Sequence, residues 1–166
     1  DLGWRARKLG KLETPLQAKI SDVLCDQDRF GQKNGKGFYN YVEGSRAPHP
    51  APENEELYIK VSEENNIERR QISEDEIVER CMLGLVNEGT RILSEGVAQR
   101  AADIDIVYIN GYGFPIWRGG PMHYANSMGL DKIVDRLDYY FEKTQSDVFR
   151  ASEFLRNLAN NGQKLG

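Results

Sequence analysis

The feature that most constrains the fold is a long amphipathic segment between Ser73 and Gly96. Ser73 and Glu76 form the S-x-x-E pattern of a helix N-terminus, in which the serine side chain accepts a hydrogen bond from the backbone N–H three residues later. Gly96 stands where such a helix needs a residue that tolerates positive φ in order to stop. We therefore predict a helix from about 73 to 96 that forms the spine of a domain.

The apolar residues of this segment recur at helical spacing, so they predict which face of the helix is buried. Ile72 and Ile77 stand at the positions of a hydrophobic staple across the helix start. An exposed apolar face of this size would favour aggregation, so we expect the 73–96 helix to be central and the most buried. The predicted buried face consists of Ile77, Cys81, Leu85 and Ile92, with Val78, Met82 and Leu93 beside them.

The rest of the chain also reads as helices, because no stretch alternates apolar and polar residues with the period of a β-strand. Ile20, Val23 and Leu24 share one helical face, and Ile104, Val107 and Tyr108 have core spacing in a later helix. The sequence therefore predicts an all-α helical bundle. Besides 73–96, the expected helices cover about 1–9, 17–28, 53–65, 102–110, 120–128, 131–143 and 152–160, the last capped by Ser152.

Two segments interrupt the helices in the first half of the chain. The run GQKNGKG at 31–37 predicts a turn, because Asn and Gly tolerate positive φ. The residues 38–41, FYNY, follow as a short extended segment whose aromatic rings are expected to pack back on the helices. Three closely spaced prolines then make 44–53 the clearest linker, since proline supplies no backbone donor to a helix or a ladder. We place a boundary between two sub-domains there.

Composition excludes several classes of function. The net charge is −4 with 29% charged residues, which gives no footprint for nucleic acid. No apolar run approaches the roughly 18–20 residues of a membrane span. Cys25 and Cys81 are far apart and match no metal-binding spacing, so we expect free, buried thiols in a reducing compartment.

Two glycine-rich segments look like nucleotide-binding loops but lack the required residues. The segment Gly111–Pro115 has Ile116 where a dinucleotide fingerprint needs its third glycine, and a helix precedes it instead of a strand. We expect this loop to end a helix while Phe114 and Trp117 enter the core. The 31–37 turn cannot be a Walker A loop, because Phe30 occupies the place of a glycine and Gly37 that of Ser or Thr.

Few individual residues are candidates for chemistry. Lys33 and Lys36 are candidate substrate-binding residues that could contact an anionic group such as a coenzyme A phosphate, or they are solvated lysines on a turn. His49 and His123 have no second ligand at metal spacing and are expected to be structural. The sequence therefore predicts no catalytic residue and no metal ligand.

Polar residues on the long helix suggest structural contacts. Asn87 and Arg91 lie four residues apart, near Glu88 and Arg80. Such residues opposite an apolar stripe form either a solvated face or hydrogen bonds to another helix.

Two motifs, NEGTRILSEGVAQRAADIDIVYINGYGFPIWRGGP at 87–121 and RFGQKNGKGFYNY at 29–41, closely resemble the C-terminal helical domain of the 3-hydroxyacyl-CoA dehydrogenases of fatty-acid β-oxidation. The resemblance is strongest to multifunctional enzymes that also carry an enoyl-CoA hydratase. It implies a bundle of the kind found in the C-terminal domain of 6-phosphogluconate dehydrogenase. It also implies a division into 1–46 as the tail of a first helical repeat, 47–72 as proline linker and polar helix, and 73–166 as a second repeat.

In that family an upstream Rossmann domain binds NAD and carries a catalytic His–Glu pair, and nothing in this chain resembles that domain. The first repeat adds an active-site asparagine from a helix reading like NRLLxPYLNEA. Laid on this chain, NEA falls on Asn87–Gly89, and the active-site asparagine falls on Glu79, followed by Arg80. The resemblance therefore implies a degenerate second repeat that packs on the first one much as a dimer partner would.

These features favour a structural part of an NAD-dependent 3-hydroxyacyl-CoA dehydrogenase that is inactive by itself and binds no cofactor. Its partners would be the upstream Rossmann domain and first repeat, with acyl-CoA as the substrate of the whole enzyme. The alternatives are an independent helical interaction module, or an enzyme whose active site is assembled from scattered residues. Asp1 in place of Met suggests a piece of a longer polypeptide.

The compartment and the packing of the first residues are further expectations. The ending Gln163–Gly166 does not match the peroxisomal S-K-L signal, which favours a bacterial cytoplasm over a peroxisome. Residues 1–41 hold too few apolar groups to form a core alone. We therefore expect Phe38 or Trp4 to be buried against the repeat at 73–142.

Overall fold

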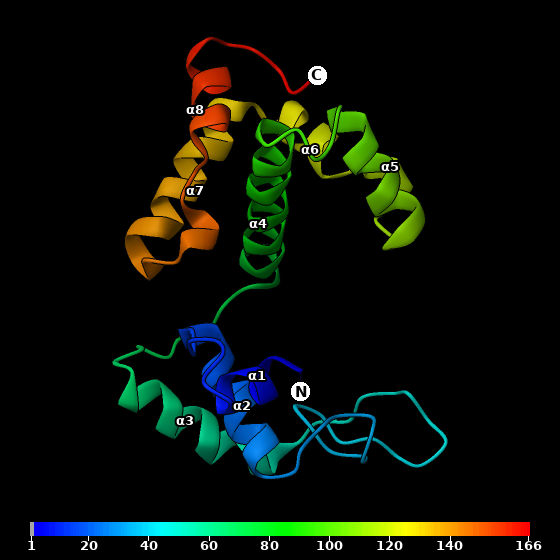
Figure 1. Ribbon diagram of the computed structural model, residues 1–166, viewed down its shortest axis with the longest axis vertical. Coiled ribbons are helices and arrows are strands. Elements are labelled where there is room, and N and C mark those ends of the chain that lie inside the picture. Colours follow the sequence, from blue (N-terminus) through cyan, green and yellow to red (C-terminus); the bar gives the residue numbers. More distant parts are fainter. Residues whose placement is uncertain (1) are drawn as a thin grey trace. The chain divides into compact units, whose positions relative to one another are not determined.

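The computed structural model describes residues 2–166, and these divide into two compact units, 2–71 and 72–166 (Figure 1). Helices make up both units. Among the described residues the only β-type pairings are isolated bridges between Gly31 and Lys36, Lys36 and Asn40, and Asn40 and His49. The prediction of an all-α fold is confirmed.

The first unit contains three α-helices, α1 (Leu2–Lys8), α2 (Lys19–Asp26) and α3 (Glu55–Glu64). Two 3₁₀ turns precede α2 and α3, namely η1 (Leu16–Ala18) and η2 (Pro52–Asn54). Helix α2 contacts both α1 and α3. The apolar side chains buried in this unit are Leu24 and Val61, so its core is small. This agrees with the expectation that the first residues hold few apolar groups.

Polar contacts fix the turn and the proline-rich segment of the first unit. The buried Asn54 donates from Nδ2 to the Gly37 carbonyl oxygen at 2.9 Å, which ties α3 to the turn. Arg29 donates to the same carbonyl at 3.1 Å and to Asn40 Oδ1 at 3.1 Å. The Asn40 and His49 backbones exchange two hydrogen bonds of 2.9 Å. The segment before η2 is therefore packed within this unit.

The 31–37 turn follows the prediction with one difference in its glycines. Gly31 and Gly35 both have φ of +79°, whereas Gly37 has no positive φ. Gly37 is required by space instead, because a Cβ there would lie 2.7 Å from Gly31 Cα.

The predicted extended segment at 38–41 is wrong, because residues 37–39 form bends. The side chains of Phe38 and Tyr39 are half exposed and line an open hollow together with Ile20 of α2 and Tyr58 of α3. Trp4 lies against the Phe30 ring with centroids 5.8 Å apart and donates from Nε1 to Asp26 Oδ1 at 2.9 Å. The burial of Phe38 or Trp4 against the 73–142 repeat stays a prediction.

The second unit is built around α4 (Glu74–Ser94). Helices α5 (Ala101–Gly111) and α6 (Pro121–Met128) pack on it, as do α7 (Leu130–Thr144) and α8 (Glu153–Asn160). Figure 1 shows α5 and α6 on one side of α4 and α7 and α8 on the other. Two 3₁₀ turns, η3 (Ile116–Arg118) and η4 (Asp147–Phe149), connect these helices. The central position predicted for this helix is confirmed.

The caps of these helices agree with the sequence. Ser73 Oγ accepts a hydrogen bond from Glu76 N at 3.2 Å, and Ser152 Oγ accepts one from Leu155 N at 3.2 Å. Gly96 follows α4 with φ of +72°. The Ser73 and Ser152 side chains each satisfy a backbone N–H group that has no acceptor inside its own helix.

The buried face of α4 differs from the predicted one. Ile77, Val78 and Cys81 are exposed, and Ile72 of the expected staple is also exposed. The buried residues begin at Met82, past the first two turns of the helix, and α6, α7 and α8 pack on α4. The α4 residues that are buried are Met82, Leu83, Val86, Asn87, Gly89 and Thr90.

Three further burial predictions are wrong in the same unit. Trp117 and Val107 are exposed, and Cys81 is an exposed thiol. Phe114 is half buried and makes an edge contact with the Tyr108 ring, with centroids 6.4 Å apart. The loop therefore ends α5, as predicted, but its tryptophan does not enter the core. The core cluster comprises Leu83, Val86, Ala101, Ile104, Met122, Ala125, Leu130, Ile133, Leu137, Tyr140, Ala151, Leu155 and Leu165.

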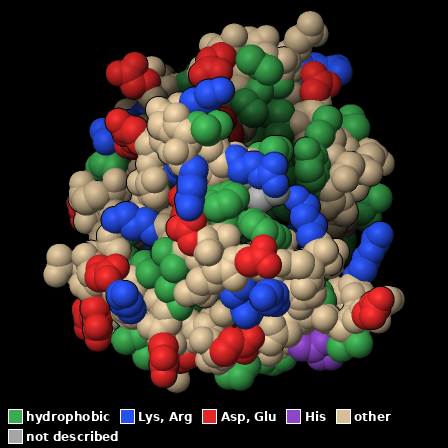
Figure 2. All heavy atoms as spheres, turned by 60° about the horizontal axis from the view of Figure 1, so that its bottom comes forward, with side chains coloured by type: hydrophobic (Ala, Val, Ile, Leu, Met, Phe, Trp, Pro, Cys, Tyr) green, Lys and Arg blue, Asp and Glu red, His purple; other side chains and the backbone are tan. Residues whose placement is uncertain are grey.

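Charged side chains are spread over the surface. The face turned forward in Figure 2 carries basic and acidic side chains intermingled, with small hydrophobic areas between them. Among the described residues, no helix combines the length and the apolar character needed to cross a bilayer.

Candidate functional site

The candidate site is a cluster of Glu79, Arg136 and Tyr140 in the second unit. It contains the position at which the resemblance places the active-site asparagine of the first repeat. Glu79 lies on the first half of α4, and Arg136 and Tyr140 lie one turn apart on α7. Their spacing of four residues puts both α7 side chains on the face toward α4.

The Glu79 carboxylate is fully engaged in this cluster. Arg136 donates from Nε to Glu79 Oε1 and from Nη2 to Oε2, both at 2.7 Å. The Tyr140 hydroxyl donates to Oε2 at 2.6 Å. A two-point arginine contact with a carboxylate is geometrically specific and stronger than a neutral hydrogen bond. Glu79 therefore cannot turn toward another partner without breaking three bonds.

These contacts set the protonation states. Hydrogen bonding from Arg136 lowers the pKa of Glu79, against the opposing effect of burial, and Tyr140 lowers it further. Burial raises the pKa of Tyr140, and the Glu79 carboxylate adds to that shift. The pKa of Arg136 is raised mainly by its hydrogen bonds to Glu79. At neutral pH the three groups are thus an anion, a neutral donor and a cation, none of which exchanges a proton readily.

Aromatic rings and a second arginine complete the surroundings. The Arg136 guanidinium lies 4.5 Å from the Tyr139 ring centroid, and that of Arg80 lies 5.0 Å from the Tyr140 ring centroid. Arg80 Nε also pairs with Glu76 Oε1 at 3.4 Å. The cluster borders an open hollow of about 570 Å³, which Arg118 and Tyr124 also line. Arginine and tyrosine stacked in this way stabilise the α4–α7 contact.

The polar groups of the cluster bond one another across two helices. Arg136 and Tyr140 of α7 hold the Glu79 carboxylate of α4, and Arg136 neutralises its charge. Within residues 2–166 no group of three or more His, Cys, Asp and Glu is arranged to hold a metal ion. The absence of catalytic residues stays a prediction.

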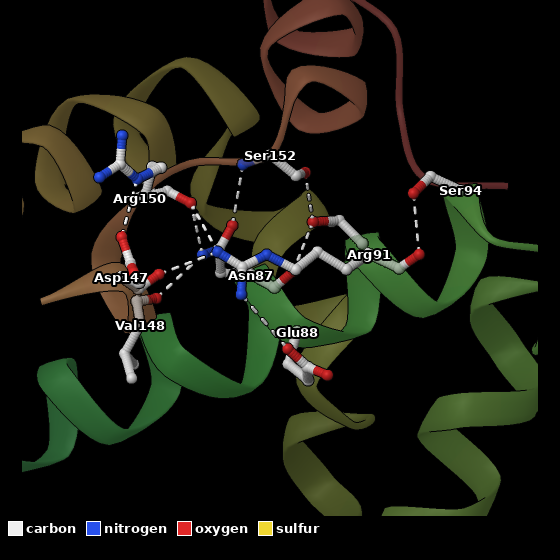
Figure 3. Close-up of polar contacts among 9 residues, drawn as sticks. Asn87, Glu88, Arg91, Ser94, Asp147, Val148, Arg150 and Ser152 are labelled. Atoms are coloured by element: carbon white, nitrogen blue, oxygen red, sulfur yellow. Dashed lines mark hydrogen bonds and ion pairs between the residues drawn. The ribbon is translucent and has the colours of Figure 1, made fainter. Parts of the chain in front are cut away.

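A second polar cluster, around Asn87, joins α4 to α8 (Figure 3). The Asn87 side chain is buried and donates from Nδ2 to the carbonyl oxygens of Val148 at 2.9 Å and Arg150 at 2.8 Å. Its Oδ1 accepts from Ser152 N at 3.0 Å. Arg91 donates to the Arg150 carbonyl at 3.1 Å. Of the two readings for Asn87 and Arg91, the hydrogen bond to another element is confirmed.

The RGGP sequence at 118–121 forms the start of α6 through a third polar contact. Asp105 on α5 accepts hydrogen bonds from Met122 N at 2.7 Å and His123 N at 3.1 Å. Burial raises the pKa of Asp105, although both N–H donors act in the opposite direction. A Cβ on Gly120 would lie 2.3 Å from Asp105 Oδ1, and Gly120 has φ of +101°. The glycine is therefore required so that α6 can approach the carboxylate.

The other residues considered from the sequence lie apart from these clusters. Lys33 and Lys36 have exposed side chains on the turn of the first unit, and their role in substrate binding stays a prediction. His49 is exposed and takes part in the bridge to Asn40 through its backbone. His123 is exposed, and its backbone N–H binds Asp105.

Sequence reasoning identified Glu79 but missed its partners. Arg136 and Tyr140 carry a weak signal, a basic and an aromatic residue at i and i+4 on one helix face. Their pairing with Glu79 depends on how α7 docks on α4, which no local pattern reveals. Asp105 gave no signal because a carboxylate within an apolar helix segment looks like a solvated residue.

Comparison with known proteins places this geometry among helical dehydrogenase domains. The family model described as 3-hydroxyacyl-CoA dehydrogenase, C-terminal domain, matches residues 77–165. The dehydrogenase part of multifunctional enzyme 1 from C. elegans has a TM-score of 0.63 and 31% sequence identity, over 92% of this chain and 34% of that chain.

Curated relatives carry names from fatty-acid metabolism. The peroxisomal bifunctional enzyme of Homo sapiens is 39% identical over 98% of this chain and 25% of its own length. The fatty acid oxidation complex subunit alpha of Pseudomonas syringae is 37% identical over 87% of this chain and 20% of its own length. The chain thus spans about a quarter or less of the curated relatives it matches.

Proposed function

This chain belongs to the 3-hydroxyacyl-CoA dehydrogenase C-terminal domain family, and from that premise we propose that it is the structural C-terminal part of a longer NAD-dependent 3-hydroxyacyl-CoA dehydrogenase. The single observation that supports the structural role best is the state of Glu79. Its carboxylate is neutralised by Arg136 and bonded by Tyr140 at the position that corresponds to the family's active-site asparagine.

The chemistry of such an enzyme resides outside this chain. The NAD-binding domain and its catalytic acid–base pair would precede the helical repeats in the complete polypeptide, and acyl-CoA would be its substrate. Hydride transfer requires a bound nicotinamide, and the protein's contribution is to bind and orient it. The helical units described here would provide the surface on which the catalytic domains are held in place.

The test compares the 166-residue chain with the complete polypeptide in NADH oxidation with acetoacetyl-CoA. We expect turnover by the complete polypeptide and none by the chain above a mock purification. Turnover by the chain alone would contradict the structural assignment. An inactive complete polypeptide, shown to be folded by circular dichroism, would contradict the dehydrogenase assignment.

Lys33 and Lys36 are proposed to assist substrate binding through the phosphates of coenzyme A. They lie on the turn that closes the first repeat in the resembling family, and an exposed ammonium can contact a phosphate as a point charge. In the complete enzyme, Lys33→Ala with Lys36→Ala should raise KM about 3- to 10-fold with kcat unchanged. Lys60→Ala, on an exposed face of α3, is the matched control. An unchanged KM in the double variant would show that neither lysine contributes to substrate binding.

The compartment is also a proposal. The relatives include animal peroxisomal enzymes and bacterial subunits, so the bacterial cytoplasm and the peroxisome are the two candidates. The 41% identity to the peroxisomal bifunctional enzyme of Danio rerio, against 37% for the Pseudomonas syringae subunit, favours the peroxisome. Imaging of the complete polypeptide with an N-terminal fluorescent tag would decide between them.

A further inference from the structure

The chain contains three Asn-Gly pairs, Asn34–Gly35, Asn110–Gly111 and Asn161–Gly162. In such a pair the backbone nitrogen of the glycine can attack the side-chain carbonyl carbon of the asparagine, because glycine has no Cβ to shield that nitrogen. All three asparagines are exposed, so exposure alone does not distinguish them. Their hydrogen bonds differ, and this difference decides which pair reacts in the folded protein.

In the described part of the chain, the attacking nitrogen is free of hydrogen bonds at one of the three pairs. Gly35 lies in the turn 32–35, and its N–H donates to no group of residues 2–166. Gly111 is the last residue of α5, where a helical N–H bonds the carbonyl oxygen four residues earlier. The Gly162 N–H donates to the Ala159 carbonyl oxygen at 3.1 Å. A bonded nitrogen must first lose its hydrogen bond before it can attack the side chain.

The side-chain carbonyl of Asn34 is also activated for attack. Its Oδ1 accepts a hydrogen bond from Phe30 N at 3.1 Å. Negative charge develops on this oxygen when Cγ is attacked, and an N–H donor stabilises that charge. Asn110 and Asn161 instead donate from Nδ2 to the carbonyl oxygen one helical turn earlier, at 2.9 and 2.8 Å. Neither of their Oδ1 atoms accepts a hydrogen bond from a described residue.

We propose that Asn34–Gly35 is the site at which the folded chain deamidates. The Gly35 nitrogen forms a bond to Asn34 Cγ, the Cγ–Nδ2 bond breaks, and ammonia leaves with the proton of the Gly35 N–H. Water then opens the resulting five-membered imide at either of its two carbonyls. The products are aspartate, with the original backbone, and isoaspartate, in which the backbone runs through the side-chain carbonyl. The reaction consumes one water and needs no oxidant or reductant.

Deamidation changes the turn in which it occurs. Asn34 Nδ2 donates to the Asp28 carbonyl oxygen at 2.5 Å, and a carboxylate has no proton to donate in its place. The new carboxylate also adds a negative charge between the exposed Lys33 and Lys36. The bonding and the charge of the 31–37 turn therefore change as the chain ages.

Peptide mapping by mass spectrometry, after incubation of the 166-residue chain at mildly alkaline pH, measures the conversion of each asparagine. The chain is incubated folded, as shown by circular dichroism, and unfolded in guanidinium chloride. Dividing the folded rate by the unfolded rate at the same site removes the effect of the neighbouring sequence. We expect this ratio to be at least about tenfold higher for Asn34 than for Asn110 and Asn161, because the two helical sites react only when their structure opens.

Two variants check the chemistry. Asn34→Gln keeps a side-chain amide but requires a six-membered ring, so conversion at this position should be lost over the period in which the wild type reacts. Asn161→Gln is the matched control and should leave conversion of Asn34 unchanged.

Three results would overturn the proposal. The first is a ratio for Asn110 or Asn161 that equals or exceeds that of Asn34. The second is conversion of Asn34 in the unfolded chain only, which would mean that the turn protects it. The third is aspartate without isoaspartate at this position, which would show direct hydrolysis of the amide without attack by the Gly35 nitrogen.

Discussion

Each unit contains a short helix that buries one leucine, and the two units stabilise these helices in different ways. In the second unit α8 rests on a continuous core, and Leu155 is enclosed together with residues of α4, α6 and α7. In the first unit α2 buries Leu24 beside few other apolar groups, and polar contacts from Asn54 and Arg29 fix the turn that follows. The elements around each helix therefore decide how much its buried leucine contributes to stability.

The largest expected difference is between the buried leucines of α2 and α8, Leu24 and Leu155. Leu155→Ala should destabilise the second unit by about 3–5 kcal/mol, because the enclosing core cannot collapse into the cavity. Leu24→Ala should cost about 2–3 kcal/mol in the first unit, where loosely enclosed neighbours can relax. Hydrogen exchange of the α8 and α2 amides measures each unit separately. Equal costs would show that the two leucines are enclosed to the same degree.

The buried asparagines give the next comparison. Asn87→Ala should cost the second unit about 3 kcal/mol, because it leaves the Val148 carbonyl oxygen and the Ser152 N–H without this partner and the Arg150 carbonyl with Arg91 alone. Asn54→Ala should cost the first unit about 1–2 kcal/mol, since it removes donors to the Gly37 and Phe38 carbonyls and to the Tyr58 hydroxyl, while Arg29 still donates to Gly37. Urea denaturation, followed by amide hydrogen exchange in each unit, measures the loss of unfolding free energy for both variants. A larger loss of stability for Asn54→Ala than for Asn87→Ala would show that the first unit depends more on its buried asparagine than the second.

The second unit requires glycine at position 120, ahead of α6, for two separate reasons, space and backbone conformation. Gly120→Ala should cost about 2–4 kcal/mol, because the added Cβ meets Asp105 and the φ of +101° is strained for alanine. Gly113→Ala is the matched control: its φ is +70° but no atom lies within 4 Å of the new Cβ, so about 1 kcal/mol is expected. Thermal unfolding of the two variants compares them. Similar losses would mean that backbone strain alone matters.

The Glu79–Arg136 pair should give a smaller, pH-dependent effect. The pKa of Glu79 is lowered in the folded state, so its contribution is fully present above its ordinary value of 4.5 and is lost as pH falls through the folded value. Both side chains are partly exposed, and Glu79→Gln should therefore cost only about 1 kcal/mol at pH 7. The difference from wild type should shrink below pH 4.5. Arg100→Gln, in the exposed pair with Asp103, should be close to neutral at every pH.

The structural features that could be predicted from the sequence are those set by residues close together in the chain. The Ser73 and Ser152 caps and the Gly96 stop are set by residues within one helical turn, so the sequence predicted them correctly. The buried face of α4 was wrong, because Ile77 and Val78 carry the apolar pattern but the core forms over Met82 and Val86. That choice depends on α6, α7 and α8, which pack on α4 from later in the chain.

In the candidate site, too, features set by nearby residues were predicted and features set by tertiary packing were not. The resemblance indicated Glu79 as the departure from the active-site asparagine, and the helix contact expected of Asn87 is present. The Arg136–Tyr140 support of Glu79 and the capping of α6 by Asp105 depend on tertiary docking. Trp117 was expected in the core because large aromatic residues are usually enclosed, yet η3 holds it at the surface with Arg118 stacked at 4.5 Å from its ring.

The central claim is that the second unit supports the enzyme without taking part in its chemistry. Its most direct test is the kcat of the complete polypeptide carrying Glu79→Gln, measured in NADH oxidation with saturating acetoacetyl-CoA beside the thermal midpoint of the same sample. The account predicts an unchanged kcat with a midpoint lowered by about 2–4 °C, since only a helix contact is weakened. A kcat reduced tenfold or more with an unchanged midpoint would contradict it and assign Glu79 to the reaction.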